Sequence, residues 1–194
     1  LSMKRFWLKM TLTSFIIVFS SALHSQAQSK VNIFLDYHYR LGLYEIHKPY
    51  NISRKESKMY GNSIHLSVLY NITKQISAGI GMGADRYENP GYNTFPLFAS
   101  AHYSPLKKHT NFYTYTNVGY AIVGKQETYK GAMWDLGVGY KKMFRRHFGL
   151  NFQVGYNWKQ FQNVPSYVMI EDAMLPSRND NTRSSISLGL GLIF

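Results

Sequence analysis

The chain ends with Arg183–Phe194, RSSISLGLGLIF. In this stretch apolar side chains alternate with small, mostly polar residues, and the apolar set is Ile186, Leu188, Leu190, Leu192 and Phe194. Only an extended strand turns a period of two into one apolar and one polar face. A strand of this length with an aromatic end is typical of a segment that crosses a bilayer and anchors at its interface. We therefore expect a transmembrane β-strand here.

The composition agrees with a membrane protein built from strands. The chain has 194 residues, enough for one closed barrel of about eight short strands. It contains 16 Tyr, 12 Phe and 3 Trp, yet its mean hydropathy is slightly negative. This disfavours helical spans, which need about 20 consecutive apolar residues. The absence of Cys excludes disulfides and thiolate metal sites.

The N-terminus has the three parts of a secretory signal. Lys4, Arg5 and Lys9 form a basic start, 10–19 is a short apolar core, and Ser25 and Ala27 are the small residues of a cleavage site before Gln28. We expect 1–27 to be removed as a signal peptide and 28–194 to form one barrel domain. Removal lowers the formal charge from +12 to +9, because three basic residues and no acids are lost. An exported chain with this charge meets anionic lipid, so we expect no nucleic-acid partner.

Period-two patterns recur along the mature chain and predict eight strands. The predicted strands are 31–43, 60–72, 76–85, 95–103, 112–122, 134–140, 148–159 and 183–194. Short connections near 73, 107 and 144 alternate with longer ones, of which 47–59 and 160–182 are the main examples. The sequence thus predicts an all-β fold, an eight-stranded antiparallel up-and-down transmembrane β-barrel.

Alternation does not say which face meets solvent, so a soluble barrel is the alternative. An eight-stranded barrel has room inside only for the side chains of one face, and the large apolar residues would overfill it. The opposite face is rich in Gly, Ser and Asn, which suit a crowded lumen. We therefore expect the apolar side chains to point outward into lipid.

Aromatic residues are predicted at both ends of the strands, where they would anchor the barrel at the two membrane interfaces. One belt contains Tyr70, Tyr103, Phe112, Tyr140, Phe148 and Phe194, and the other contains Tyr60, Phe95, Trp134 and Trp158.

With these features the chain resembles the small eight-stranded outer-membrane β-barrel proteins of Gram-negative bacteria, the OmpA-barrel and OmpX-like group. The resemblance rests on the strand count, the short turns, Gly-rich strands such as the one with Gly79, Gly81 and Gly83, and the C-terminal Phe194. It implies a place in the cell outer membrane. It also implies recognition of the last strand by the barrel assembly machinery. The functions of the group vary, so the resemblance implies fold and location more than activity.

Charged and titratable residues fall on the face predicted to line the lumen. These residues are Asp36, His38, Arg40, His65, Asp85, His102, Asp135 and Lys159. Unpaired charges would be costly in so narrow an interior, so we expect a network of ion pairs and hydrogen bonds that plugs the barrel. A proton-responsive or conducting lumen, a narrow pore, is the alternative.

An enzymatic alternative rests on His65 and Ser67. They have the spacing of the catalytic pair in outer-membrane lipid A deacylases, whose His and Ser face the bilayer. In this chain both residues fall on the inward face, so a polar lumen pair is the competing interpretation. The sequence contains no phosphate loop, metal-ligand spacing or nucleophile motif, so we assign no catalytic residue, metal site or cofactor.

The predicted loops are the candidate binding surfaces. Basic residues in 47–59, Lys48, Arg54, Lys55 and Lys58, suit the phosphates of outer-membrane lipid and lipopolysaccharide or an acidic partner surface. The 160–182 loop is unusually apolar, and we predict a partner site there, at Tyr167, Val168, Met169, Ile170, Met174 and Leu175. The leading hypothesis is a non-enzymatic structural or interaction protein, for example an accessory subunit of a larger outer-membrane complex.

Overall fold

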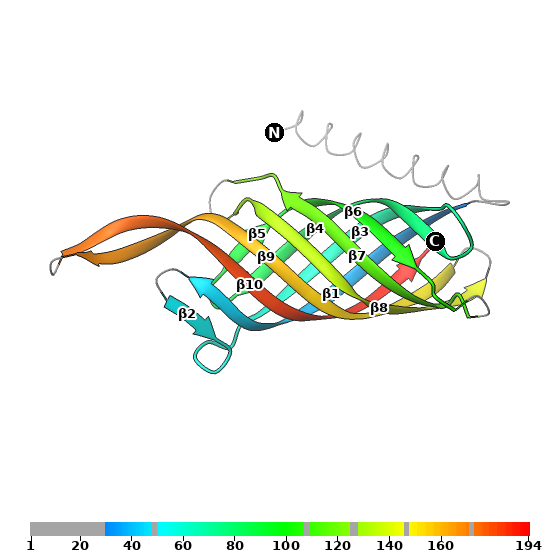
Figure 1. Cartoon of the computed structure of the whole chain (residues 1–194), viewed down its shortest axis with the longest axis horizontal. Coiled ribbons are helices and arrows are strands. Elements are labelled where there is room, and N and C mark those ends of the chain that lie inside the picture. The colour runs from blue at the N-terminus through cyan, green and yellow to red at the C-terminus, as the bar shows by residue number, and fades with distance from the viewer. Residues whose placement is uncertain (1–29, 48–49, 107–108, 125–127, 146–147, 171–172) are drawn as a thin grey trace, which may run out of the picture.

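The chain forms a closed antiparallel β-barrel (Figure 1). The computed structural model describes residues 30–47, 50–106, 109–124, 128–145, 148–170 and 173–194. The predicted signal peptide, 1–27, lies outside these residues. No helix within the described ranges is long and apolar enough to cross a membrane.

Eight strands close the ring, each antiparallel to its neighbours, and the last pairs with the first. In chain order the strands are β1 (Val31–His47), β2 (Tyr50–Ser53), β3 (Tyr60–Asn71), β4 (Ile76–Glu88), β5 (Tyr92–Thr94), β6 (Pro96–Tyr103), β7 (Phe112–Ala121), β8 (Gly131–Arg145), β9 (Phe148–Ile170) and β10 (Ala173–Ile193). Strands β5 and β6 pair with consecutive parts of β4, so together they fill one strand position in the ring. Among the described residues, β2 pairs only with the end of β1.

The predicted orientation of the two faces is confirmed. Along β9 and β10, Phe152, Val154, Leu188 and Leu190 are 44 to 53% exposed on the outer wall. Their alternating neighbours Gln153 and Ser187 are buried inside. Since so many large apolar side chains face outward, the outer wall is suited to lipid and not to water.

The interior is filled because large side chains lie over glycines of neighbouring strands. A Cβ atom at Gly139 would collide with the ring of Tyr113, and one at Gly81 would collide with Phe98. Both aromatic rings are buried. The glycines in the strands therefore provide the space that the inward aromatic residues occupy.

Two predicted loops contain strand. The 47–59 connection includes β2, which extends the edge of β1 as a short hairpin. The 160–182 segment is not an irregular loop: β9 and β10 continue through it as a paired hairpin, with a register shift between Asn179 and Asn181. This hairpin extends beyond the rest of the barrel, at the opposite end from the C-terminus (Figure 1).

Candidate functional site

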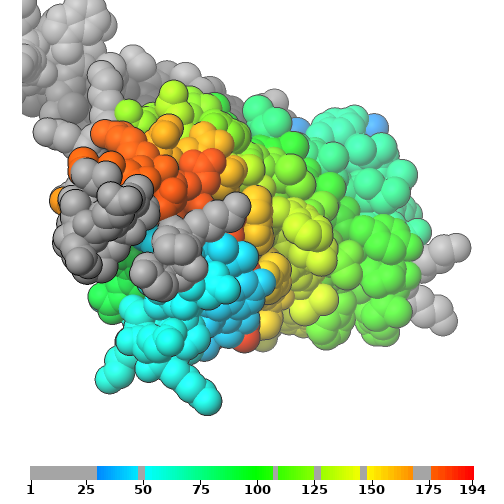
Figure 2. Space-filling model, turned by 60° about the vertical axis from the view of Figure 1, so that its left-hand side comes forward, coloured from blue at the N-terminus to red at the C-terminus, as the bar shows by residue number. Residues whose placement is uncertain are grey.

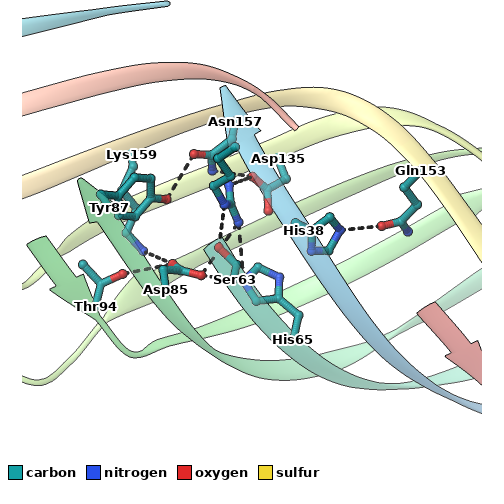
Figure 3. A network of polar contacts seen from close by, with 11 residues as sticks. His38, Ser63, His65, Asp85, Tyr87, Thr94, Asp135, Gln153, Asn157 and Lys159 are labelled. Atoms are coloured by element: carbon teal, nitrogen blue, oxygen red, sulfur yellow. Dashed lines mark hydrogen bonds and ion pairs between the residues drawn. The ribbon is translucent and has the colours of Figure 1, made fainter. Parts of the chain in front are cut away.

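A charged network centred on Arg40 is buried inside the barrel. Figure 3 shows the network, with Asp85, Asp135 and Lys159 among its labelled residues. Its guanidinium lies 3.1 Å from Asp135 Oδ1 and 3.8 Å from Asp85 Oδ1, and it donates a hydrogen bond to Ser63 Oγ. On the other side of Asp85, Lys159 Nζ lies 3.1 Å from Oδ2. Two cations thus face two carboxylates, so the charges balance within this network.

Further polar groups contact the two carboxylates. His65 Nε2 lies 2.7 Å from Asp85 Oδ1, and Thr94 donates to Asp85 Oδ2 at 2.9 Å. The Asn157 amide donates to Asp135 and accepts a hydrogen bond from Tyr87 Oη at 3.1 Å. These contacts join residues from β1, β3, β4, β5, β8 and β9, so the network ties together much of the circumference of the barrel (Figure 3).

A second network lies nearer the C-terminal end of the barrel. Asp36 accepts a 2.7 Å hydrogen bond from the amide of Asn151, which in turn accepts one from Tyr113. The Tyr113 hydroxyl also accepts from Gln153, and Gln153 Oε1 lies 2.7 Å from His38 Nε2. The ring of His102 stacks on Tyr113, with centroids 4.6 Å apart. All eight predicted lumen residues are therefore buried inside the barrel.

A third cluster, at the hairpin end, was missed by the sequence analysis. Glu45 and Arg183 are fully buried and form an ion pair, with Arg183 Nη2 2.6 Å and Nε 2.7 Å from Glu45 Oε2. The Arg183 guanidinium also donates to the carbonyls of Glu88 and Pro90. It lies 5.4 to 6.0 Å from the ring centroids of Tyr87, Tyr92 and Phe161. Aromatic surfaces and a carboxylate thus close this end of the lumen.

The enzymatic hypothesis based on His65 and Ser67 does not fit this geometry. Both residues are buried on the inner wall, and the His65 imidazole is engaged by Asp85 and approached by Arg40 Nη2 at 3.4 Å. A lipid in the surrounding bilayer has no access to them from the outer wall. Within the described ranges, no group of three or more His, Cys, Asp or Glu side chains is placed to hold a metal ion.

The base of the β9–β10 hairpin is joined to the barrel by a small apolar core. Phe161 and Val164 are buried against Tyr87 and Tyr92, and Tyr129 packs on the same cluster. Phe161 and Tyr92 are stacked, with centroids 4.2 Å apart. The hairpin therefore leaves the barrel from a fixed base.

Further along the hairpin, the predicted partner residues are only partly described. Tyr167 is 68% exposed. The backbones of Val168 and Leu175 and of Met169 and Met174 face each other across the two strands, and Ile170 pairs with Ala173. The side chains of Val168, Met169, Ile170, Met174 and Leu175 lie outside the described part of the structure. Figure 2 turns this end toward the viewer and shows the orange hairpin beside the cyan segment around β2.

The predicted aromatic anchors lie on the outer wall or at its ends. Tyr60, Tyr70, Phe95, Tyr103, Phe112, Trp134 and Phe148 are 38 to 53% exposed, while Tyr140, Trp158 and Phe194 are half-buried. Near the C-terminal end, Phe112 contacts Tyr140 and Phe148 contacts Phe194. Trp134 and Trp158 are register partners on β8 and β9. These positions suit interfacial anchoring at two depths.

The basic residues of the 47–59 segment do not act as one group. Lys55 and Lys58 are exposed, but the Arg54 guanidinium donates to the carbonyls of Gly42 and Met59. Lys48 lies outside the described residues. In the same turn, Glu56 accepts hydrogen bonds from the backbone N–H and the hydroxyl of Ser53, which hold the pKa of its carboxyl below the ordinary range.

A closed antiparallel ring with a polar, filled lumen and an apolar outer wall is the architecture of the small eight-stranded outer-membrane β-barrels, and the predicted fold is confirmed. No protein-family model and no curated protein matches the sequence.

Similar solved structures include Neisserial surface protein A, with 16% identity, a TM-score of 0.44, and 85% of this chain and 96% of that chain covered. The outer membrane protein OprG from Pseudomonas aeruginosa has 11% identity, a TM-score of 0.39, and coverages of 86% and 96%. A de novo designed transmembrane β-barrel has 9% identity, a TM-score of 0.38, and coverages of 82% and 93%. These likenesses are too distant to inform the function, which is argued below from residues.

Proposed function

We propose that the protein is a non-enzymatic component of the Gram-negative outer membrane and that it is exported with a signal peptide that is then cleaved. In this proposal the plugged barrel holds an external β-hairpin, and the hairpin is the binding surface for a partner protein. The observation that carries this proposal is the pairing of β9 and β10. Strand β10 pairs with β1 only as far as Thr182, and β9 pairs with β8 only as far as Lys159.

Beyond those residues the Gln162 N–H still donates to the Lys130 carbonyl. Among the described residues, no further strand pairs with the outer edges of the hairpin. Unpaired backbone donors and acceptors at such edges are a template for an added strand from another protein. Tyr167 adds an exposed aromatic side chain to this surface, and aromatic residues contribute strongly to protein interfaces. A partner strand and one aromatic anchor are the recognition mode that this geometry supports.

The fixed base of the hairpin favours binding. Because Phe161 and Val164 are packed on the barrel, the hairpin loses less freedom when a partner docks than a free loop would. An accessory role in a larger outer-membrane complex follows from such a rigid, membrane-anchored surface. Outer-membrane lipid, lipopolysaccharide and, through the strand ending at Phe194, the barrel assembly machinery are the further partners that we propose.

Cross-linking in intact cells followed by purification from detergent tests the partner surface. One variant replaces 167–175 with a Gly and Ser linker of equal length and keeps the packed base at Phe161 and Val164. A matched control replaces 54–58, in the neighbouring β2–β3 connection, in the same way. We expect the cross-linked partner to disappear from the first variant and to persist in the second. An unchanged set of cross-links in the first variant would refute the hairpin as the binding surface.

Two further measurements separate the alternatives. The charge-paired lumen leads us to expect no single-channel conductance steps in planar bilayers, whereas a narrow pore would give them. Mass analysis of lipid A from cells with and without the protein tests the enzyme, and an altered acyl pattern that depends on His65 and Ser67 would overturn the non-enzymatic role.

A further inference from the structure

A cavity of about 700 Å³ opens at the end of the barrel opposite the hairpin. Residues from the strand ends and short turns line it, among them Asn71, Ser77 and Asn111, and three of the lining residues are lysines: Lys30, Lys74 and Lys141. None of the lining residues is acidic. We call this cavity the lysine cup.

An apolar cluster lies beside the cup. Ile193 lines it and packs with Phe34 and Leu69 into a fully buried apolar cluster. Asp36 lies one inward position beyond Phe34 on β1 and is engaged by Asn151. The Ile193 cluster therefore forms part of the wall of the cup.

The three lysines lack carboxylate partners among the described residues. No ion pair in the described part of the chain involves Lys30, Lys74 or Lys141. Lys30 Nζ lies 5.9 Å from the centroid of the Tyr70 ring and Lys141 Nζ lies 5.0 Å from that of Tyr113. Aromatic rings position these ammonium groups without neutralising them.

The uncharged lining residues also offer donors. The Asn71 side-chain oxygen accepts hydrogen bonds from the Asn32 amide and from Ser77 Oγ, at 3.0 and 2.6 Å. With its oxygen used in this way, Asn71 presents its NH2 group as a donor. Three ammonium groups and an oriented amide in one cavity make a site for a group with more than one negative charge.

The charge distribution along the chain supports an anion at this end. The ten acidic residues are Asp36, Glu45, Glu56, Asp85, Glu88, Glu127, Asp135, Glu171, Asp172 and Asp180. None lies in the short connections 72–75, 104–111 and 144–148, which carry Lys74, Lys107, Lys108, Arg145 and Arg146. A cavity whose lining carries three lysines and no acid attracts and concentrates an oppositely charged ligand.

We propose that the lysine cup binds a phosphate monoester, carried by a small soluble molecule or by a lipid headgroup of the adjoining leaflet. A phosphate monoester has a charge of about −1.5 to −2 at neutral pH and three acceptor oxygens, which match the ammonium and amide donors of the cup. The site is independent of the external hairpin, so either proposal stands without the other.

Isothermal titration of the purified protein in phosphatidylcholine nanodiscs with glycerol 3-phosphate tests the soluble form of the ligand. Native mass spectrometry of nanodiscs that also contain phosphatidic acid tests the headgroup form. The test variant is Lys30→Gln, Lys74→Gln and Lys141→Gln combined. The matched control, Lys130→Gln, Lys142→Gln and Arg178→Gln combined, removes the same charge from exposed positions. Heat-dependent migration on gels confirms that each variant is folded.

We expect saturable binding in at least one arm, weakened at least about tenfold in the cup variant because charge-assisted hydrogen bonds to phosphate are lost, and nearly unchanged in the control. Binding in the first arm identifies a soluble ligand, and binding in the second arm alone identifies a lipid headgroup. No saturable binding in either arm, or an equal loss in the control variant, overturns the cup.

Discussion

Removing Arg183 is expected to destabilise the barrel more than removing any exposed charge. Arg183→Met would leave the fully buried Glu45 carboxylate without its arginine partner. Its remaining contacts would be the hydroxyl of Tyr92 at 2.9 Å, the amide of Asn181 at 3.3 Å and His47 Nδ1 at 3.9 Å. An uncompensated buried charge of this kind costs about 3–5 kcal/mol. The substitution also removes two hydrogen bonds to carbonyls and the contacts with three aromatic rings.

A double-mutant cycle separates the ion pair from these other losses. Glu45→Gln combined with Arg183→Met removes both charges, so the double variant should be more stable than the sum of the two single losses predicts, by about 2–3 kcal/mol. The exposed pair of Arg86 and Glu88, 2.7 Å apart with side chains 47% and 28% exposed, is the control. Its cycle should give about 0.2–1 kcal/mol.

Urea unfolding in short-chain phosphatidylcholine vesicles, followed by the fluorescence of Trp134 and Trp158, measures all of these free energies. A coupling energy for Glu45 and Arg183 no larger than that of the surface pair would refute the stabilising role of this buried ion pair at the hairpin end of the lumen. A loss for Arg183→Met below about 1 kcal/mol would refute it as well, since ordinary surface substitutions cost less than this.

Three other outcomes are expected from the same structure. Gly139→Leu should lower the free energy of unfolding by about 1–3 kcal/mol because the added side chain meets the Tyr113 ring. Tyr113→Ala in the same chain should restore part of this loss. Gly91→Leu, at an exposed glycine with room for a side chain, should be near neutral in the urea assay. Val154→Lys, on the lipid-facing wall, should cost about 2–4 kcal/mol, as expected for a lysine at the bilayer midplane. Tyr167→Lys on the exposed hairpin should cost little. Equal effects in the urea assay would contradict a lipid-facing position for Val154. In a carboxyl NMR titration, Glu56 should titrate below the ordinary glutamate pKa. Its hydrogen bonds to Ser53 should therefore stabilise the turn at pH values above the ordinary pKa, and this stabilisation should be lost as the pH falls through the folded-state pKa. Ser53→Ala should move the titration midpoint upward, and an unmoved midpoint would show that the hydroxyl has no part in the shift.

The strands could be predicted from the sequence because two different environments act on their two faces. Lipid outside selects large apolar residues such as Phe152 and Val154, and the narrow lumen inside selects Gly, Ser and paired polar groups. This contrast holds only where a strand has lipid on one side. In 160–182 it disappears, and Pro165 and Pro176 add a loop-like signal. The hairpin was therefore predicted as a loop although its strands are paired.

The Glu45–Arg183 pair was missed for a different physical reason. Strict alternation from Asp36, His38 and Arg40 assigns Glu45 to the outer face. The register of β1 against β10 shifts between Gly42 and Tyr44, and this irregularity turns Glu45 inward and Tyr44 outward. A bulge of one residue is invisible to a period-two analysis, and it reverses the face of every residue after it. Only the backbone geometry places the carboxylate beside Arg183.

The lumen charges also explain why the two ends of the barrel differ. Asp85 and Asp135 are neutralised by Arg40 and Lys159 in the middle, and Glu45 is neutralised by Arg183 near the hairpin, so carboxylates and cations are matched along this part of the lumen. Toward the short turns the matching stops, because Lys30, Lys74 and Lys141 face a cavity lined by no acid. Self-repulsion among these lysines opposes folding unless water, salt or a bound anion screens it. An anion in the cup should therefore stabilise the folded barrel, and raising the ionic strength should reduce that stabilisation.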